Sequence, residues 1–103
     1  MSAMDSERRH PLRIDADHPS LAGHFPGNPV VPGVLLLDRV LDAVEAWLGE
    51  RPEPLRLPQV KFLQPLLPEQ AAEIVLERGA GRLRFRVTRA GELIASGELD
   101  MAA

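Results

Sequence analysis

One histidine and one aspartate, fourteen positions apart, are the residues of this 103-residue chain best suited to acid–base chemistry. His24 stands in a segment rich in proline and glycine, and Asp38 follows a run of apolar residues. A neutral imidazole can accept a proton near pH 7, because its unperturbed pKa is about 6.5. A carboxylic acid that stays protonated part of the time can donate one. Together they supply what the elimination of water requires: a base that removes a proton and an acid that protonates the departing hydroxide.

A stiff loop and a helix must hold these two side chains. The segment 17–32 contains four prolines and two glycines, which predicts a structured loop rather than a regular element. Pro32 and Gly33 then open a helix that Gly49 is expected to end. Its first turn, 34–37, is apolar all round, so we expect the beginning of the helix to be buried on every side. The rest of the helix carries one apolar stripe with helical spacing: Leu37, Val40, Leu41, Val44, Trp47 and Leu48.

The remaining chain alternates between apolar and polar residues in the manner of β-strands. The expected extended segments are 12–15, 57–67, 72–77, 82–87 and 93–99. A helix followed by several sequential strands predicts an α+β domain, with the helix on one face of an antiparallel sheet. We expect residues 1–11, which are polar, to form a flexible N-terminus and residues 12–103 to form a single domain.

Composition narrows the classes of partner and cofactor. The chain has no cysteine, which excludes disulfides and a thiolate nucleophile, and a net charge of −3 argues against a nucleic-acid binder. Its longest apolar run has four residues, too short to span a membrane, and its polar beginning lacks a signal peptide, so we expect a cytoplasmic protein. His10 and His18 lack the context of His24 and are expected to be solvated. The spacing of the three histidines fits no metal template, so no metal or other cofactor is expected.

The stretch from His24 to Asp38 closely resembles the active-site motif of the hotdog-fold 3-hydroxyacyl-[acyl-carrier-protein] dehydratases. It consists of His-Phe-Pro-Gly-Asn-Pro-Val-Val-Pro-Gly, an apolar run and then the acid, which that family has as Asp or Glu. The segment Val60–Pro68 is similar to a lysine–phenylalanine strand that precedes a proline-containing bend in the family. This resemblance implies the hotdog fold, a curved antiparallel sheet wrapped around one long central helix.

The resemblance also implies an activity and roles for individual residues. The chain would be a lyase of fatty acid or related lipid synthesis that dehydrates a 3-hydroxyacyl thioester to the trans-2-enoyl thioester. His24 would be the base, Asp38 the acid, and the Gly33 N–H at the helix beginning would stabilise the thioester oxygen. We expect the leucines beside Asp38 to desolvate its carboxyl group. The other motif residues would shape the loop or line a substrate channel: Phe25, Pro26, Gly27, Pro29, Val30, Val31, Pro32 and, further on, Leu36. For Val30, Val31 and Leu36 a place in the hydrophobic core is the more ordinary interpretation.

Two partners follow from the same resemblance. A second copy of the chain would pair its sheet edge with the first, giving a homodimer or an oligomer of dimers. His24 of one protomer would then face Asp38 of its mate. The other partner would be an acidic acyl carrier protein that bears the substrate. Arg82, Arg84 and Arg86 lie on one face of a strand and could recruit it, although a solvated sheet face is the more ordinary interpretation.

Two other functions remain open from the sequence. A hotdog acyl thioesterase also sets a helix carboxylate against a thioester, although such enzymes typically lack the His-Phe-Pro-Gly loop. A non-catalytic, acyl-binding hotdog subunit would need no intact acid–base pair. Asp38 stands where many dehydratases of the family carry Glu, and Asp is typical of its dehydratase/isomerase branch. Acyl chain length, carrier, pathway and isomerase activity are therefore left undetermined.

Overall fold

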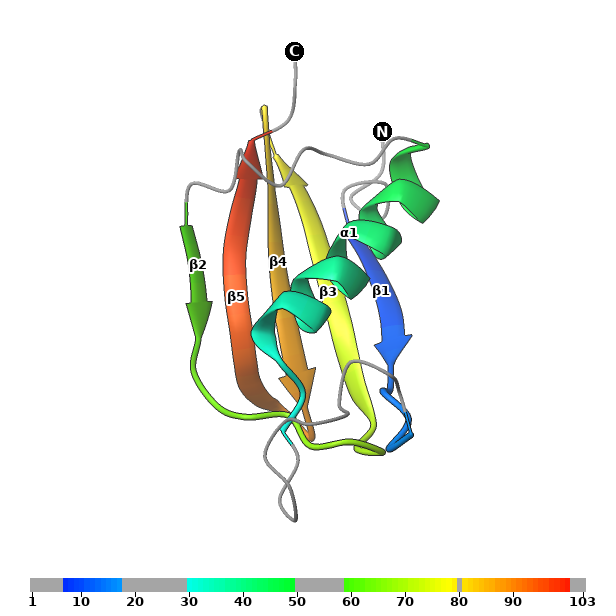
Figure 1. The fold of residues 1–103 in the computed structure, drawn as a ribbon. Coiled ribbons are helices and arrows are strands. Elements are labelled where there is room, and N and C mark those ends of the chain that lie inside the picture. Colours follow the sequence, from blue (N-terminus) through cyan, green and yellow to red (C-terminus); the bar gives the residue numbers. More distant parts are fainter. Residues whose placement is uncertain (1–6, 18–29, 50–58, 80, 101–103) are drawn as a thin grey trace.

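A computed structural model of the chain describes residues 7–17, 30–49, 59–79 and 81–100. One helix lies diagonally across one face of a five-stranded antiparallel sheet (Figure 1). The strand order is β1-β3-β4-β5-β2, so β1 and β2 form the two edges. This architecture confirms the α+β hotdog fold. The elements are β1 (Glu7–Leu12), α1 (Gly33–Leu48), β2 (Gln59–Phe62), β3 (Ala72–Gly79), β4 (Arg82–Arg89) and β5 (Glu92–Asp100).

The helix α1 has the ends that its sequence predicts. Pro32 precedes it in an extended conformation (φ −62°, ψ 143°), and its carbonyl accepts the N–H groups of Leu35 and Leu36 at 3.0 and 3.2 Å. Gly49 ends the helix in the left-handed region at φ 83°, where glycine has no steric penalty, and its N–H donates to the carbonyl of Glu45. Within the described residues, no helix is long and apolar enough to cross a membrane.

The core lies between α1 and the inner face of the sheet. On β4 the residues that face α1, Leu83, Phe85 and Val87, are almost completely buried, while the arginines between them point outward. This is the alternation that the sequence shows. The helix contributes its own buried side chains to the same cluster: Leu35, Leu36, Val40, Leu41, Ala43 and Val44.

Strand boundaries differ from the expected ones at the beginning of the chain. The strand expected over 12–15 is instead β1, whose residues 7–12 pair with β3 in antiparallel register. Residues 7–11 are therefore part of the sheet rather than of a flexible N-terminus; residues 1–6 lie outside the described part. His10, expected to be solvated, lies opposite Ile74, and its Nε2 is buried without a hydrogen-bond partner among the described residues. His18 lies outside the described residues.

The middle and end of the sheet show two further differences. The long extended run expected over 57–67 is a strand only at β2, and residues 63–71 form irregular structure; residues 50–58 are not described. Gly97 does not interrupt β5. A Cβ atom there would lie 2.6 Å from both the Gln59 carbonyl oxygen and a ring carbon of Phe85, so glycine allows β2 and the Phe85 ring to approach β5 closely.

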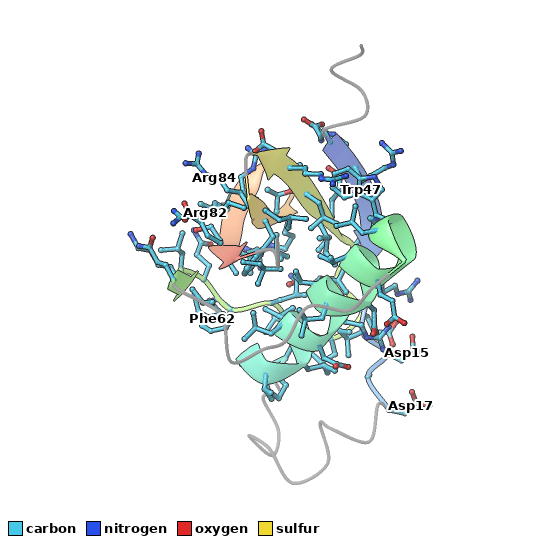
Figure 2. The ribbon with its side chains drawn as sticks, turned by 90° about the horizontal axis from the view of Figure 1, so that it is seen from above. Asp15, Asp17, Trp47, Phe62, Arg82 and Arg84 are labelled. Atoms are coloured by element: carbon cyan, nitrogen blue, oxygen red, sulfur yellow. The ribbon has the colours of Figure 1, made fainter. Side chains whose placement is uncertain are left out.

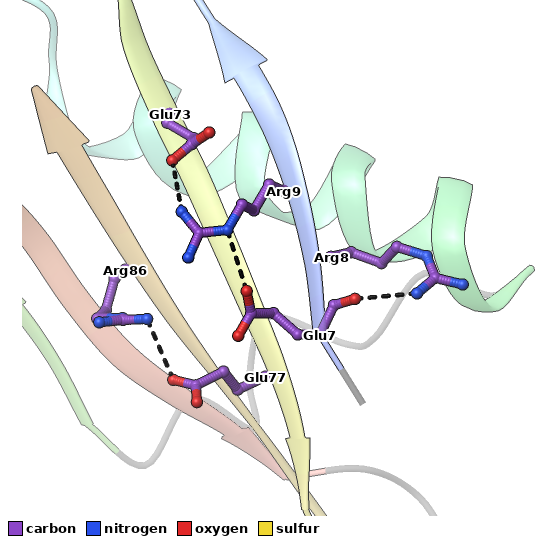
Figure 3. A network of polar contacts seen from close by, with 6 residues as sticks. All are labelled: Glu7, Arg8, Arg9, Glu73, Glu77 and Arg86. Carbon is purple, nitrogen blue, oxygen red and sulfur yellow. Dashed lines mark hydrogen bonds and ion pairs between the residues drawn. The ribbon is translucent and has the colours of Figure 1, made fainter. Parts of the chain in front are cut away.

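The outer face of the sheet carries paired charges. Glu98 lies 2.9 Å from an Arg82 guanidinium nitrogen and 3.3 Å from one of Arg84, and Glu77 lies 3.4 Å from Arg86. Arg9 adds pairs with Glu7 and Glu73, each at 3.0 Å (Figure 3). Arg82, Arg84 and Arg86 therefore lie among carboxylates, as a solvated sheet face predicts.

Candidate active site

The structure places part of the predicted motif. Val30, Val31 and Pro32 lead into α1, Gly33 is its first residue, and Asp38 stands in its second turn. Asp38 is exposed, so the leucines beside it do not desolvate its carboxyl group in the single chain. Five motif residues lie outside the described part of the chain: His24, Phe25, Pro26, Gly27 and Pro29.

The beginning of α1 has the properties of an anion-binding position. Pro32 provides no side-chain cap, and the first turn contains no acidic residue. In residues 30–49 and the other described ranges, no acceptor is found for the N–H groups of Gly33 and Val34. Unsatisfied N–H groups and the helix dipole together favour negative charge at such a position. The geometry can therefore stabilise an oxygen that gains negative charge beside Gly33.

Phe62, the last residue of β2, lies against this helix beginning. A Cβ atom on Gly33 would lie 2.8 Å from Cζ of the Phe62 ring, so only glycine permits the contact as it stands. Figure 2 shows Phe62 on the side of the sheet that faces α1, whereas Arg82 and Arg84 lie on the opposite side. Phe62 is 51% exposed, so its ring is only half covered at this position.

An apolar pocket of about 510 Å³ opens beside the helix beginning. This volume falls within the range of about 300–1,000 Å³ that is typical of small-molecule sites. The motif indicates one wall, Val30, Val31 and Leu36, as one of two interpretations. It does not indicate the other wall, which comes from the segment after β2. The complete lining is Val30, Val31, Gly33, Leu36, Phe62, Leu63, Gln64, Pro65 and Leu66.

The expectation that the first helical turn is buried on every side is wrong for the single chain. Leu35 and Leu36 are buried in the core, but Val34 is 75% exposed. Phe62 and Leu63 are 51% and 52% exposed, on the edge strand β2 and just after it. Exposed apolar side chains thus occur both at the beginning of α1 and at the β2 edge, next to the pocket.

Glu69 connects the chain after β1 to the segment after β2. Its carboxylate accepts the Ala16 N–H at 2.7 Å and the guanidinium of Arg13, and its own N–H donates to the Ile14 carbonyl at 2.7 Å. The Ala16 N–H, followed by the Arg13 side chain, lowers the pKa of the Glu69 carboxyl below its ordinary value near 4.5. These contacts position residues 13–16, which precede the segment of His24 in the sequence.

We predict that Glu69→Gln weakens the dependence of stability on acidic pH. A lowered folded-state pKa means that the ionised carboxylate stabilises the fold above the unfolded-state pKa. That contribution is lost as the pH falls through the folded-state value. The free energy of unfolding should therefore fall less steeply for Glu69→Gln than for the wild type below about pH 4.5. Chemical unfolding between about pH 2 and pH 7 measures this.

The matched control is Glu77→Gln, which changes a carboxylate on the outer face of the sheet, away from these contacts. Parallel pH profiles for the wild type and Glu69→Gln would show that ionisation of the Glu69 carboxyl group does not stabilise the folded state.

Comparison with known proteins shows which family the chain belongs to. Residues 2–98 match the model of the ApeI-like family, which is described as ApeI dehydratase. The chain belongs to the ApeI-like dehydratase family. Dehydratases are hydro-lyases, the class of enzyme that the motif from His24 to Asp38 also indicates.

Curated relatives of this ApeI-like chain carry the name 3-hydroxyacyl-[acyl-carrier-protein] dehydratase FabZ. The protein of Chlamydia trachomatis serovar D is 33% identical over 101 residues, which cover 84% of this chain and 66% of the relative. That of Chloroflexus aggregans is 36% identical over 83 residues, covering 79% of this chain and 46% of the relative. The chain thus spans less than two thirds of the length of these two relatives.

Two solved structures share the fold. The dehydratase heterocomplex ApeI:P from Xenorhabdus doucetiae contains a chain with a TM-score of 0.83 and 24% identity, covering 96% of this chain and 89% of that one. An uncharacterized protein from Erwinia carotovora subsp. atroseptica has a TM-score of 0.78 and 29% identity, with 91% and 81% of the two chains covered.

Proposed function

We propose that this ApeI-like chain dehydrates a 3-hydroxyacyl thioester carried by an acyl carrier protein to the trans-2-enoyl thioester. The observation that carries the proposal is the family match over residues 2–98, which includes the complete stretch from His24 to Asp38. The structure adds two fitting features at the end of that stretch. They are the N–H groups at the beginning of α1, for which the described residues offer no acceptor, and the apolar pocket beside them.

In the proposed reaction the His24 imidazole removes a proton from the carbon next to the thioester. The electrons of that C–H bond form the new double bond, and the β-hydroxyl leaves. Asp38 protonates it, so the products are the enoyl thioester and water. The Gly33 N–H stabilises the negative charge that builds on the thioester oxygen, an effect worth about 2.7–4 kcal/mol for one well-placed donor elsewhere.

We further propose that two copies of the chain complete each site. Among the residues that the structure describes, no strand pairs with the outer edge of β2, and Val34, Phe62, Leu63 and Asp38 are exposed. An open edge strand flanked by exposed apolar side chains favours pairing with another chain. Pairing two β2 edges about a two-fold axis would cover these side chains and set His24 of one copy opposite Asp38 of the other.

The partners are part of the same proposal. A homodimer, alone or in an oligomer of dimers, is the assembly we propose; the Xenorhabdus relative was solved in a heterocomplex, which keeps a different subunit as the alternative. The paired charges on the outer sheet face do not favour Arg82, Arg84 and Arg86 as the docking surface for an acidic carrier. The cytoplasmic location stays a prediction from the sequence.

We predict that Gly33→Val lowers activity far more than stability. A branched side chain would displace the Phe62 ring and occupy the space beside the Gly33 N–H. Displacing a substrate by about 1 Å can cost on the order of 10²-fold in rate. Steady-state kinetics and thermal unfolding of the same preparations measure the two effects. A large drop in melting temperature with unchanged turnover of the folded fraction would instead give Gly33 a purely structural role.

The product of the reaction tests the proposed function. Purified protein is incubated with 3-hydroxyacyl-acyl carrier protein and, separately, with the corresponding coenzyme A thioester, and the acyl group is followed by mass spectrometry. Loss of one water from the carrier-bound acyl group is the expected result. Release of free 3-hydroxy acid would identify a thioesterase, and no change with either thioester would favour a non-catalytic subunit; both results would overturn the proposal.

A further inference from the structure

Arg89, the last residue of β4, reaches across to the irregular segment that follows β2. Its Nη1 donates to the Pro65 carbonyl at 2.9 Å and to Oε1 of Gln70 at 3.1 Å, and its Nη2 lies 3.5 Å from Oε1 of Gln64. Nη2 also lies 3.6 Å from a carboxylate oxygen of Glu92. The Arg89 side chain is 21% exposed, against 44% for Arg86 on the same strand. Arg89 is therefore held in place by its partners.

The groups that Arg89 binds belong to a bend that lies outside the strands. The beginning of the bend is held to β5, because the Leu63 and Gln64 N–H groups donate to the Ile94 carbonyl at 2.8 and 3.2 Å. Pro65 has no N–H and cannot extend the ladder of β2. The Gln70 side chain also accepts the Leu67 N–H at 2.9 Å, and the Gln70 N–H donates back to the Leu67 carbonyl at 3.3 Å. The bend is thus closed on itself, and Arg89 attaches it to β4.

The same bend forms one wall of the apolar pocket. Gln64, Pro65 and Leu66 all line it, and two of the three are direct partners of Arg89. The Leu66 carbonyl accepts the Val31 N–H at 2.8 Å, two residues before Gly33. A continuous series of contacts therefore runs from Arg89 through the bend to the beginning of α1.

We propose that Arg89 is a positioning residue that fixes this pocket wall and thereby sets the length of acyl chain the site accepts. The inference rests on the proposed dehydration for its kinetic readout. An acyl chain that extends past the reacting carbons would contact the wall, whereas a short one would not. A pocket can discriminate about 10–200-fold for a single methylene group, so a small shift of its wall changes selectivity measurably.

Arginine is suited to this role because its planar guanidinium presents several donors in a fixed arrangement. Nη1 of Arg89 donates both to the Pro65 backbone carbonyl and to the Gln70 side-chain amide oxygen. A lysine keeps the charge but lacks this fixed arrangement. Because the Pro65 and Gln64 residues are exposed, water can replace the lost donor, so removal of Arg89 should cost little stability.

The test compares Arg89→Ala and Arg89→Lys with Arg86→Ala, a matched arginine on the same strand whose partner, Glu77, lies on the outer face. The ratio of kcat/KM for a 3-hydroxyacyl substrate of about ten carbons to one of about four should fall about 10-fold in Arg89→Ala. Arg89→Lys should recover only part of the ratio, and Arg86→Ala should keep it. An unchanged ratio in Arg89→Ala, an equal loss on both substrates, or full recovery by lysine would overturn the inference.

A second readout does not depend on activity. Hydrogen exchange of the Val31 amide reports on its bond to Leu66, and we expect exchange to quicken about 10-fold in Arg89→Ala and to stay unchanged in Arg86→Ala. Wild-type protein inactive on every thioester would overturn the proposed function while this measurement still decides the role of Arg89. Unchanged Val31 exchange in Arg89→Ala would overturn the positioning role whatever the activity.

Discussion

Replacing His24 with alanine is expected to lower the rate of dehydration by about 10²–10⁴-fold, the usual loss when a positioned general base is removed. Without the imidazole, no group of the proposed site can accept the proton on the carbon next to the thioester. We expect the fold to stay intact, so the melting temperature should stay close to that of the wild type. Turnover measured on enoyl product, together with thermal unfolding, gives both values.

His10→Ala is the control for this prediction. His10 lies on β1 outside the motif, so its removal should leave turnover close to the wild-type value even if it changes stability. If His24→Ala protein turned over substrate nearly as fast as the wild type, another group would have to be the base.

Asp38→Asn is expected to cause a comparable loss, at least about 10²-fold, because an amide cannot protonate a departing hydroxide. The change preserves the size of the side chain, and Asp38 is exposed, so folding should be unaffected. Asp38→Glu should retain activity, because the resembling family uses either acid. Near-normal turnover by Asp38→Asn would remove Asp38 from the mechanism.

Asp42→Asn provides the matched control on the same helix, one turn further on. It is exposed like Asp38 but lies away from the beginning of α1, so its turnover should stay close to that of the wild type. The difference in turnover between Asp38→Asn and Asp42→Asn separates the role of Asp38 as an acid from the general effect of removing a negative charge from the helix.

Much of the fold could be predicted because its periodic patterns are strong. The stripe on α1 and the alternation of Leu83, Phe85 and Val87 with arginines each fix one buried face. The beginning of β1 was missed because two of its inward-facing residues are polar. His10 lies opposite Ile74, and the guanidinium of Arg8 lies 5.1 Å from the Trp47 ring centre. Pairing with β3 and that contact with the end of α1 are tertiary effects that a local pattern does not contain.

The candidate site was predictable only as far as its residues are neighbours in the sequence. The motif indicated one wall of the pocket, with Val30 and Val31 in it. The other wall and the Arg89 hydrogen bonds come from segments more than thirty residues after Val30 and Val31. Only the folded chain brings these segments together. The expectation that Val34 is buried is wrong for a different reason. An apolar side chain can belong to an interface between chains as well as to a core.

Mixing the two inactive variants tests most directly the claim that His24 and Asp38 of different copies form one dehydration site. His24→Ala and Asp38→Asn proteins are combined under conditions that allow subunits to exchange, and dehydration is measured over time. With random exchange half of the dimers are mixed and each holds one complete site, so activity should rise to about a quarter of the wild-type value. Activity that stays at the level of the separate variants, although mixed dimers form, would contradict the shared site.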